Sequence, residues 1–128
     1  MKNYYIDRCL ELRDVYLDYP FDKGEWAAVR HSDNKKIFAL IYERNNNICI
    51  NFKNTPEWGV FWRESFDAVS PAYHMNKEHW STVVIGSDAD EYQIMQMVAD
   101  SYNLTKSKKR IKNEQQTEKH FRNSLHPV

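Results

Sequence analysis

The pattern of residues 25–53 predicts three short strands joined by tight turns, and it constrains the fold more than any other part of the chain. Glu25–His31 has a two-residue repeat around Trp26, Ala28 and Arg30, and Ile48–Lys53 alternates between Ile48, Ile50 and Phe52 on one side and Cys49, Asn51 and Lys53 on the other. Lys36–Glu43 carries apolar residues on both parities, which is typical of a central strand. The segments are separated by Ser32–Lys35 and Asn45–Asn47, two clusters of turn-forming residues. An antiparallel meander is therefore predicted.

A helix is expected before the meander and another directly after it. Apolar residues at spacings of three and four predict the first helix over residues 3–17, ended by Pro20. Thr55-Pro56-Glu57 has the composition of a helix start, with a cap, a proline at the first position and an acid near the positive end of the dipole. The apolar face of that second helix is Trp58, Phe61, Trp62 and Phe66.

The rest of the chain predicts a strand or strand pair, a third helix and a basic tail. Ala72–Ile85 contains the strand pattern, clearest over residues 82–85. The third helix is expected over Ala89–Leu104, with Ser87 or Asp88 as its cap. Its buried stripe is Ile94, Met97, Val98, Ser101 and Tyr102.

The order α-β-β-β-α-β(β)-α predicts an α+β fold of two layers, with an antiparallel sheet of four or five strands and helices on one face. We expect one domain over residues 1–104 and a polar, basic tail over residues 105–128 that is partly helical or disordered. The residues expected to be mostly buried are Phe38, Leu40, Ile50, Phe61, Val69, Val83, Ile94 and Val98.

Charge is unevenly distributed, although the formal net charge of the 128 residues is zero. From Asn103 onward there are seven basic and two acidic residues, a net charge of +5, so residues 1–102 carry −5. No apolar run approaches the roughly 20 residues that cross a bilayer, and the first residues lack the apolar stretch of a signal peptide. Cys9 and Cys49 fit reduced thiols, and we expect a cytoplasmic protein without a membrane partner.

The segment Tyr73-His74-Met75-Asn76-Lys77-Glu78-His79-Trp80-Ser81-Thr82 has neither a helical nor an alternating apolar pattern. Together with Trp62-Arg63-Glu64 and Pro71 upstream, it resembles the signature of the MmcQ/YjbR family of small bacterial proteins. The resemblance runs from about Tyr16 to Tyr102. It implies a compact α+β domain similar to secretion chaperones and described as a "double wing", with no known cofactor or catalytic residues. Members are commonly described as DNA-binding.

Two features depart from the family pattern. The turn at Pro20-Phe21-Asp22 carries Asp and Lys where members usually have Gly, and the basic extension past Lys112 is longer than expected. These departures concern the first turn and the tail rather than the fold.

Catalysis and metal binding receive little support from the sequence. His74 and His79 are separated by four residues within the segment, and two histidines are too few ligands for a tight zinc site. The three glycines stand singly at Gly24, Gly59 and Gly86, so there is no glycine-rich phosphate loop. We expect no enzyme activity, no cofactor and no bound metal.

Nucleic-acid binding receives more support, because cations, an aromatic ring and an amide occur close together. We predict weak DNA binding without sequence specificity, by a protein acting as a monomer. Lys35 and Lys36 are expected at a hairpin tip, and Asn51 and Lys53 on the outward parity of the third strand. The candidate residues are Lys35, Lys36, Lys53, Asn76, Lys77, His79, Trp80, Lys106, Lys108, Lys109 and Arg110. The alternative is a chaperone-like module that binds a protein partner and has no role with nucleic acid.

Overall fold

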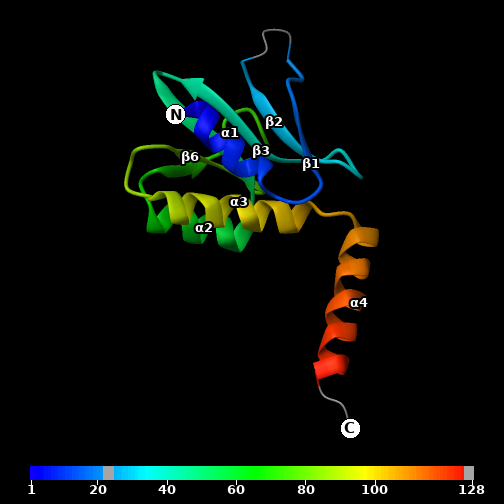
Figure 1. Cartoon of the computed structure of the whole chain (residues 1–128). Coiled ribbons are helices and arrows are strands. Elements are labelled where there is room, and N and C mark those ends of the chain that lie inside the picture. The colour runs from blue at the N-terminus through cyan, green and yellow to red at the C-terminus, as the bar shows by residue number, and fades with distance from the viewer. Residues whose placement is uncertain (22–24, 126–128) are drawn as a thin grey trace.

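A six-stranded antiparallel sheet forms the centre of the molecule within residues 1–21 and 25–125, which the computed structural model describes (Figure 1). The strand order is β1-β2-β3-β4-β6-β5, so the predicted meander is confirmed as β2-β3-β4. The strands are β1 Val15–Asp18, β2 Ala27–His31, β3 Ile37–Arg44, β4 Asn47–Lys53, β5 Val69–Pro71 and β6 Trp80–Val84. The helices are α1 Lys2–Leu10, α2 Pro56–Ser65, α3 Glu91–Thr105 and α4 Lys108–Leu125. The α+β prediction is confirmed, with more strands than the four or five expected.

The first helix was predicted too long, and this error hid a strand. Helix α1 ends at Leu10, and Asp14 takes a φ of +57° where the chain turns into β1. Leu17 fits the helical spacing from Arg13, but Val15 and Leu17 together fit a two-residue alternation. Pairing of β1 with β2 decides between them, supported by a 2.9 Å ion pair from Arg30 to Asp18.

The turn between β3 and β4 follows from its asparagines. Asn45 and Asn46 lie between the paired residues Arg44 and Asn47, and both have positive φ. A two-residue hairpin turn with positive φ at both positions matches the twist of the flanking strands, and asparagine tolerates that conformation better than most residues. Asp22 and Lys23 of the departing first turn lie outside the described residues.

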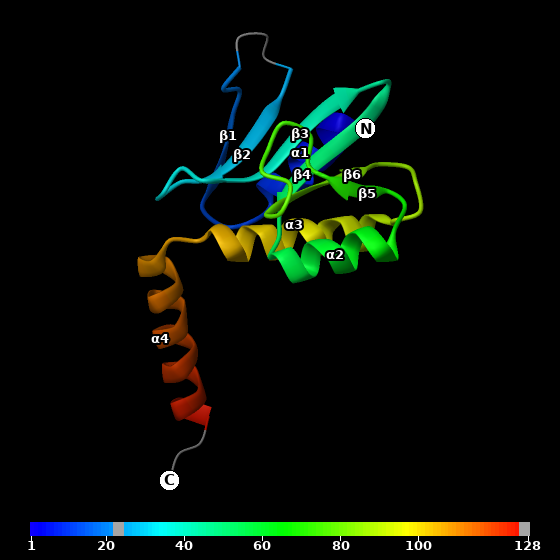
Figure 2. The same cartoon turned by 180° about the vertical axis from the view of Figure 1, so that it is seen from behind.

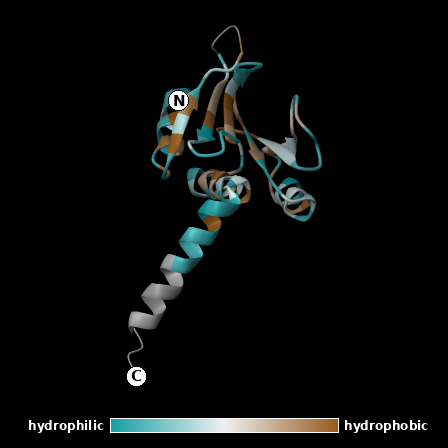
Figure 3. Ribbon diagram, turned by 90° about the vertical axis from the view of Figure 1, so that its right-hand side faces the viewer, coloured by the Kyte–Doolittle hydropathy of each residue, from teal (hydrophilic) through white to brown (hydrophobic). Residues whose placement is uncertain are grey.

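Helices α1, α2 and α3 pack on one face of the sheet around a continuous apolar core. Tyr5 and Cys9 of α1, Trp62 of α2, and Met97 of α3 meet strand residues such as Ile50 there. Seven of the eight residues expected to be buried are buried; Phe61 is half exposed. Helix α2 packs mainly on the edge strand β5, so its wide apolar face exceeds what its neighbours cover. The strands carry most of the hydrophobic colour in Figure 3, whereas the coloured part of α4 is largely hydrophilic.

A β-bulge places Phe38 in this core. The pairs Val29 with Ala39 and Arg30 with Ile37 leave Phe38 without a direct partner on β2. A bulged strand carries two residues opposite one, which allows Phe38 to join Ala39 in the helix-side core. The Phe38 carbonyl accepts a 2.7 Å hydrogen bond from Ser101 Oγ, so the bulge is also bonded to α3.

The opposite face of the sheet is also covered, which contradicts the outward position predicted for Asn51. Residues 72–79 cross β3 and β4 there (Figure 2), and Tyr73 and Met75 pack on a second cluster that includes Tyr42. Asn51 Oδ1 accepts hydrogen bonds from Tyr42 Oη at 2.8 Å and Thr82 Oγ1 at 2.6 Å. Asn51 Nδ2 donates to the Tyr73 carbonyl at 2.9 Å. Asn51 is therefore buried and holds the covering segment to the sheet.

Two boundaries differ from prediction on the C-terminal side of α2. Of the strand or strand pair predicted over Ala72–Ile85, only one strand, β6, is present, because β5 ends at Pro71 and a loop follows. Helix α3 is capped by Asp90, whose side chain accepts from Gln93 N in a reciprocal capping box, rather than by Ser87 or Asp88. Asp88 instead accepts from the backbone N–H groups of Asp67 and Ala68, which lower the pKa of its carboxyl group.

Helix α4 leaves the body of the molecule after a short link from α3 (Figures 1 and 2). It occupies most of the region expected as a basic tail, and residues 126–128 lie outside the described residues. Within the described part of the chain, no helix is both long and apolar enough to span a membrane.

Candidate functional site

Four strand ends meet at one end of the sheet and bring distant candidate residues together. Antiparallel pairing places the end of β2, the start of β3, the end of β4 and the start of β6 at this end. Lys35 and Lys36 are exposed in the turn between β2 and β3. Lys53 ends β4, opposite Trp80 of β6. We call this region the basic end.

The link between α3 and α4 lies against the same turn. Asn34 Nδ2 donates to the Thr105 carbonyl at 2.9 Å, and Ser107 Oγ donates to Asp33 Oδ2 at 2.6 Å. The exposed Lys108 and Lys109 follow directly in α4. The fold thus joins the tail lysines to the hairpin lysines at the basic end.

Two of the candidate cations from the basic tail are engaged within the protein. Lys106 Nζ pairs with Glu114 at 2.7 Å. Arg110 donates to His31 Nδ1 and to the Arg13 carbonyl, each at 2.9 Å, and to Tyr102 Oη. Arg110 therefore ties α4 to the body, and its guanidinium is largely buried rather than presented to a ligand.

The signature segment combines structural contacts with accessible polar groups. Asn76 Oδ1 accepts from the backbone N–H groups of Glu78 and His79, so the side chain of Asn76 shapes the loop. Lys77 and His79 are exposed, although Lys77 Nζ also donates to the Ala72 carbonyl at 2.9 Å. Tyr73 and Trp80 are both partly exposed, so their rings anchor the segment without being fully buried.

The two signature histidines lie in different surroundings. His74 has a φ of +63° and packs against the Tyr73 ring at 4.0 Å, whereas His79 lies near the end of the loop. Among the described residues, no three His, Cys, Asp or Glu side chains gather as a metal site would require. The absence of a bound metal remains a prediction, and elemental analysis showing stoichiometric zinc would contradict it.

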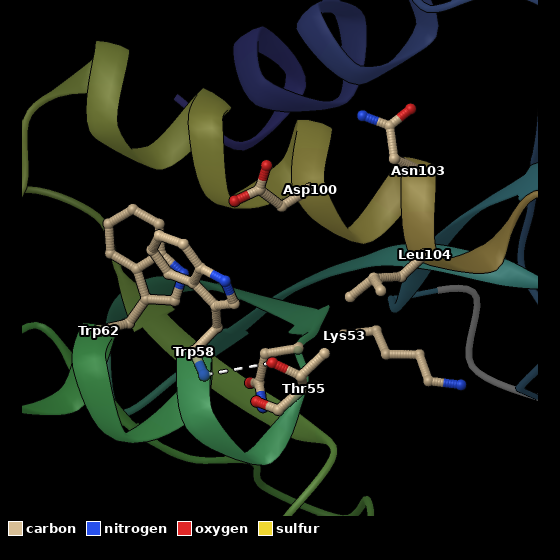
Figure 4. Close-up of a pocket in the computed structure, with 8 residues that line it drawn as sticks. Lys53, Thr55, Trp58, Trp62, Asp100, Asn103 and Leu104 are labelled. Carbon is tan, nitrogen blue, oxygen red and sulfur yellow. Dashed lines mark hydrogen bonds between the residues drawn. The ribbon is translucent and has the colours of Figure 1, made fainter.

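A groove of about 340 Å³ lies between α2 and α3 beside the basic end (Figure 4). Trp58 and Trp62 come from α2, and Asp100 and Leu104 face them from α3. Burial raises the pKa of the Asp100 carboxyl group. The lining residues are Lys53, Asn54, Thr55, Trp58, Trp62, Asp100, Asn103 and Leu104.

The start of α2 positions Trp58. Thr55 Oγ1 accepts from Trp58 N at 3.2 Å, as the sequence predicted for the cap. A Cβ on Gly59 would lie 2.5 Å from Asn54 Nδ2, so glycine allows the helix to approach the end of β4. The Trp58 side chain is half exposed at 51% and packs edge-on against Phe61 at 5.0 Å.

Sequence reasoning missed the groove as a site because it assigned Trp58 to the apolar face of α2. One signal was available: Trp58, Phe61 and Trp62 in one short helix, with Phe66 directly after it, form a face wider than one neighbouring element covers. The strand order places α2 near the edge of the sheet, and this position leaves part of its aromatic face uncovered.

An antiparallel sheet carrying three helices on one face and a signature loop on the other defines a small α+β domain of a recurring type. The chain matches the YjbR family model over residues 10–104 and belongs to the YjbR family. The resemblance identified from the sequence is thereby confirmed. Helix α4 lies beyond the matched residues.

Relatives share much of the chain. "Uncharacterized protein YjbR" of Escherichia coli K12 is 32% identical over 91 residues, covering 68% of this chain and 77% of its own length. "Uncharacterized protein YyaQ" of Bacillus subtilis is 34% identical over 100 residues, covering 70% of this chain and 84% of its own length.

Solved structures agree with the fold. A crystal structure of a Pseudomonas syringae protein matches with a TM-score of 0.74 and 32% identity, covering 83% of this chain and 99% of that one. A crystal structure of a Deinococcus radiodurans protein with a DUF419 domain matches with a TM-score of 0.73 and 25% identity, covering 83% of this chain and 78% of that one.

Proposed function

We propose that this YjbR-family protein binds nucleic acid weakly and without sequence specificity at the basic end. The observation that supports the proposal is the convergence of lysines from separate parts of the chain, all of them exposed except Lys53, which is partly buried. The turn contributes Lys35 and Lys36, β4 contributes Lys53, and α4 contributes Lys108 and Lys109. The proposed activity is binding by a monomer, without a reaction or a cofactor.

The expected weakness has a physical cause. Lysine contacts to phosphate attract any sequence, because they do not read base edges. Asp33 and Glu78 lie near the same lysines, and residues 1–102 carry −5 overall, so part of the attraction is cancelled. Two buried free cysteines, Cys9 and Cys49, are consistent with the reducing cytoplasm as the place of action.

Replacing a basic-end lysine is expected to weaken binding in a salt-dependent way. Fluorescence anisotropy with a labelled duplex and a labelled single strand, at low and moderate salt, measures the affinity. Lys36→Ala and Lys109→Ala should each reduce the slope of log affinity against log salt by about 1, because each removes about one phosphate contact.

Lys2→Ala is the matched control for these variants. Lys2 Nζ donates to the Glu25 carbonyl just before β2, and Lys36 follows the opposite end of that strand. The control should keep the wild-type slope. An equal reduction of that slope in all three variants would mean that the net charge of the protein, rather than the basic end, governs binding.

A protein-binding role is the second candidate, favoured by the outer surface of α2. Trp58, Val60 and Phe61 are about half exposed there, an unusual number of large apolar side chains on one short helix. If neither the duplex nor the single strand binds at low salt, this role becomes the better proposal. Analytical ultracentrifugation of the wild type and of Phe61→Ala would then test whether the surface joins two copies.

A further inference from the structure

We propose that the groove between α2 and α3 receives an unstacked base, so that the protein prefers single-stranded nucleic acid to duplex. The inference rests on the proposed function and adds the class of nucleic acid that is bound. Trp58 is the stacking surface, and Lys53 is the cation that holds the adjoining phosphate.

The Trp58 ring is held in place while about half of its surface is left open. Phe61 packs edge-on against it at 5.0 Å, and Trp62 lies behind it at 5.7 Å with a 35° tilt. Trp62 is buried in the core, so the support is firm. A braced, half-exposed indole offers a stacking face at little cost in side-chain entropy.

The lining of the groove suits a base better than a phosphate. Trp58 and Leu104 supply apolar surface, while Asn103 and Thr55 supply groups that hydrogen-bond to base edges. Asp100 would repel a phosphate inside the groove, although its carboxylate accepts hydrogen bonds from exocyclic amino groups. The volume of about 340 Å³ lies within the range of small-ligand sites.

The groove is continuous with the basic end, which gives the backbone of a strand a path. Lys53 lines the groove at the end of β4. Leu104 precedes Thr105, whose carbonyl accepts from Asn34 beside Lys35. A strand with its base at Trp58 therefore has exposed lysines along its phosphates. A duplex keeps its bases stacked and paired, so it engages the lysines alone.

The test compares two probes on the full-length protein by fluorescence anisotropy at low salt. The probes are a labelled single strand of about ten nucleotides and its duplex, a length within the site sizes of single-strand binders. The wild type should bind the single strand more tightly. Trp58→Ala should weaken single-strand binding about 10-fold, as loss of one stacked base does, and leave duplex binding unchanged. Trp58→Phe should restore part of the loss.

Val60→Ala is the matched control, because it removes a half-exposed apolar side chain of the same helix that neither lines the groove nor belongs to the rings packed around Trp58. It should retain most of the single-strand preference. Urea unfolding of both variants checks that each remains folded, as expected for half-exposed side chains.

The outcomes separate this inference from the proposed function. If Lys36→Ala and Lys109→Ala weaken both probes while Trp58→Ala changes neither, the inference is wrong and the proposed function stands. If neither probe binds the wild type at low salt, the proposed function itself fails. If Trp58→Ala leaves both affinities unchanged but turns a dimer into a monomer, the groove is a contact between two copies, and the inference is overturned.

Discussion

Phe38→Ala is expected to lower the free energy of unfolding by about 3–5 kcal/mol, enough to threaten a marginally stable domain. The Phe38 side chain is fully buried and lies 5.2 Å from both the His31 and Tyr102 rings. Truncation removes the apolar contacts and leaves a cavity at the bulge, whose backbone is bonded to Ser101 and so resists collapse. Urea unfolding followed by circular dichroism measures the change.

Phe61→Ala provides the same substitution at a half-exposed site, 50% accessible on α2. Its cost should be about 1 kcal/mol or less, since little transfer free energy and no closed cavity are involved. Equal costs at the two positions would contradict the burial difference between them.

The protein is expected to lose about 3 kcal/mol of stability as pH falls from 6.5 to 4, through His31 alone. His31 is fully buried, and burial together with the charge of Arg110 lowers its pKa to about 4. Arg110 only donates, so His31 Nδ1 must accept, and Nε2 donates to Thr105 Oγ1 at 2.8 Å. Protonation would place a second N–H against the guanidinium.

The sign follows from the direction of that shift. Between pH 6.5 and 4, His31 is protonated in the unfolded chain and neutral in the folded one. The unfolded state therefore binds more protons, and the stability decreases as the pH is lowered. Asp33 opposes the shift, whereas Lys106 and Lys36 add to it.

His31→Gln is the control for this prediction. A carboxamide can accept from Arg110 and donate to Thr105, but it does not titrate. Urea unfolding between pH 7.5 and 4 should show a shallower pH dependence for the variant, whatever its absolute stability. Parallel curves for the two proteins would show that His31 does not carry the effect.

Local chemistry was enough to predict several elements from the sequence. The asparagine turn, the capped start of α2 and the alternation in β4 each depend on residues next to one another in the chain. The periodicity of α3 predicted its buried stripe for the same reason, since Ile94, Met97 and Val98 face one side of any helix formed there. The signature segment carried the family resemblance without any need for a structure.

Contacts between distant segments decided the rest. Residues 15–18 became β1 because β2 offers them an edge, and Asn51 became buried because the loop at Tyr73 folds over it. The alternation of side chains along a strand assigns each residue to one face of the sheet, but it does not show whether another segment covers that face.

The candidate site also depended on tertiary structure. Its residues were largely recognised from their types, since lysines in a turn and in a basic tail attract phosphate wherever they lie. Their convergence at one end of the sheet required the strand order and the bonds from the turn to Thr105 and Ser107. The burial of Arg110 and the exposure of Trp58 were likewise set by which elements pack together. The sequence by itself determined which chemical groups the chain carries and where its local elements begin; only the tertiary structure decided which of those groups are exposed together, because burial depends on neighbours far away in the chain.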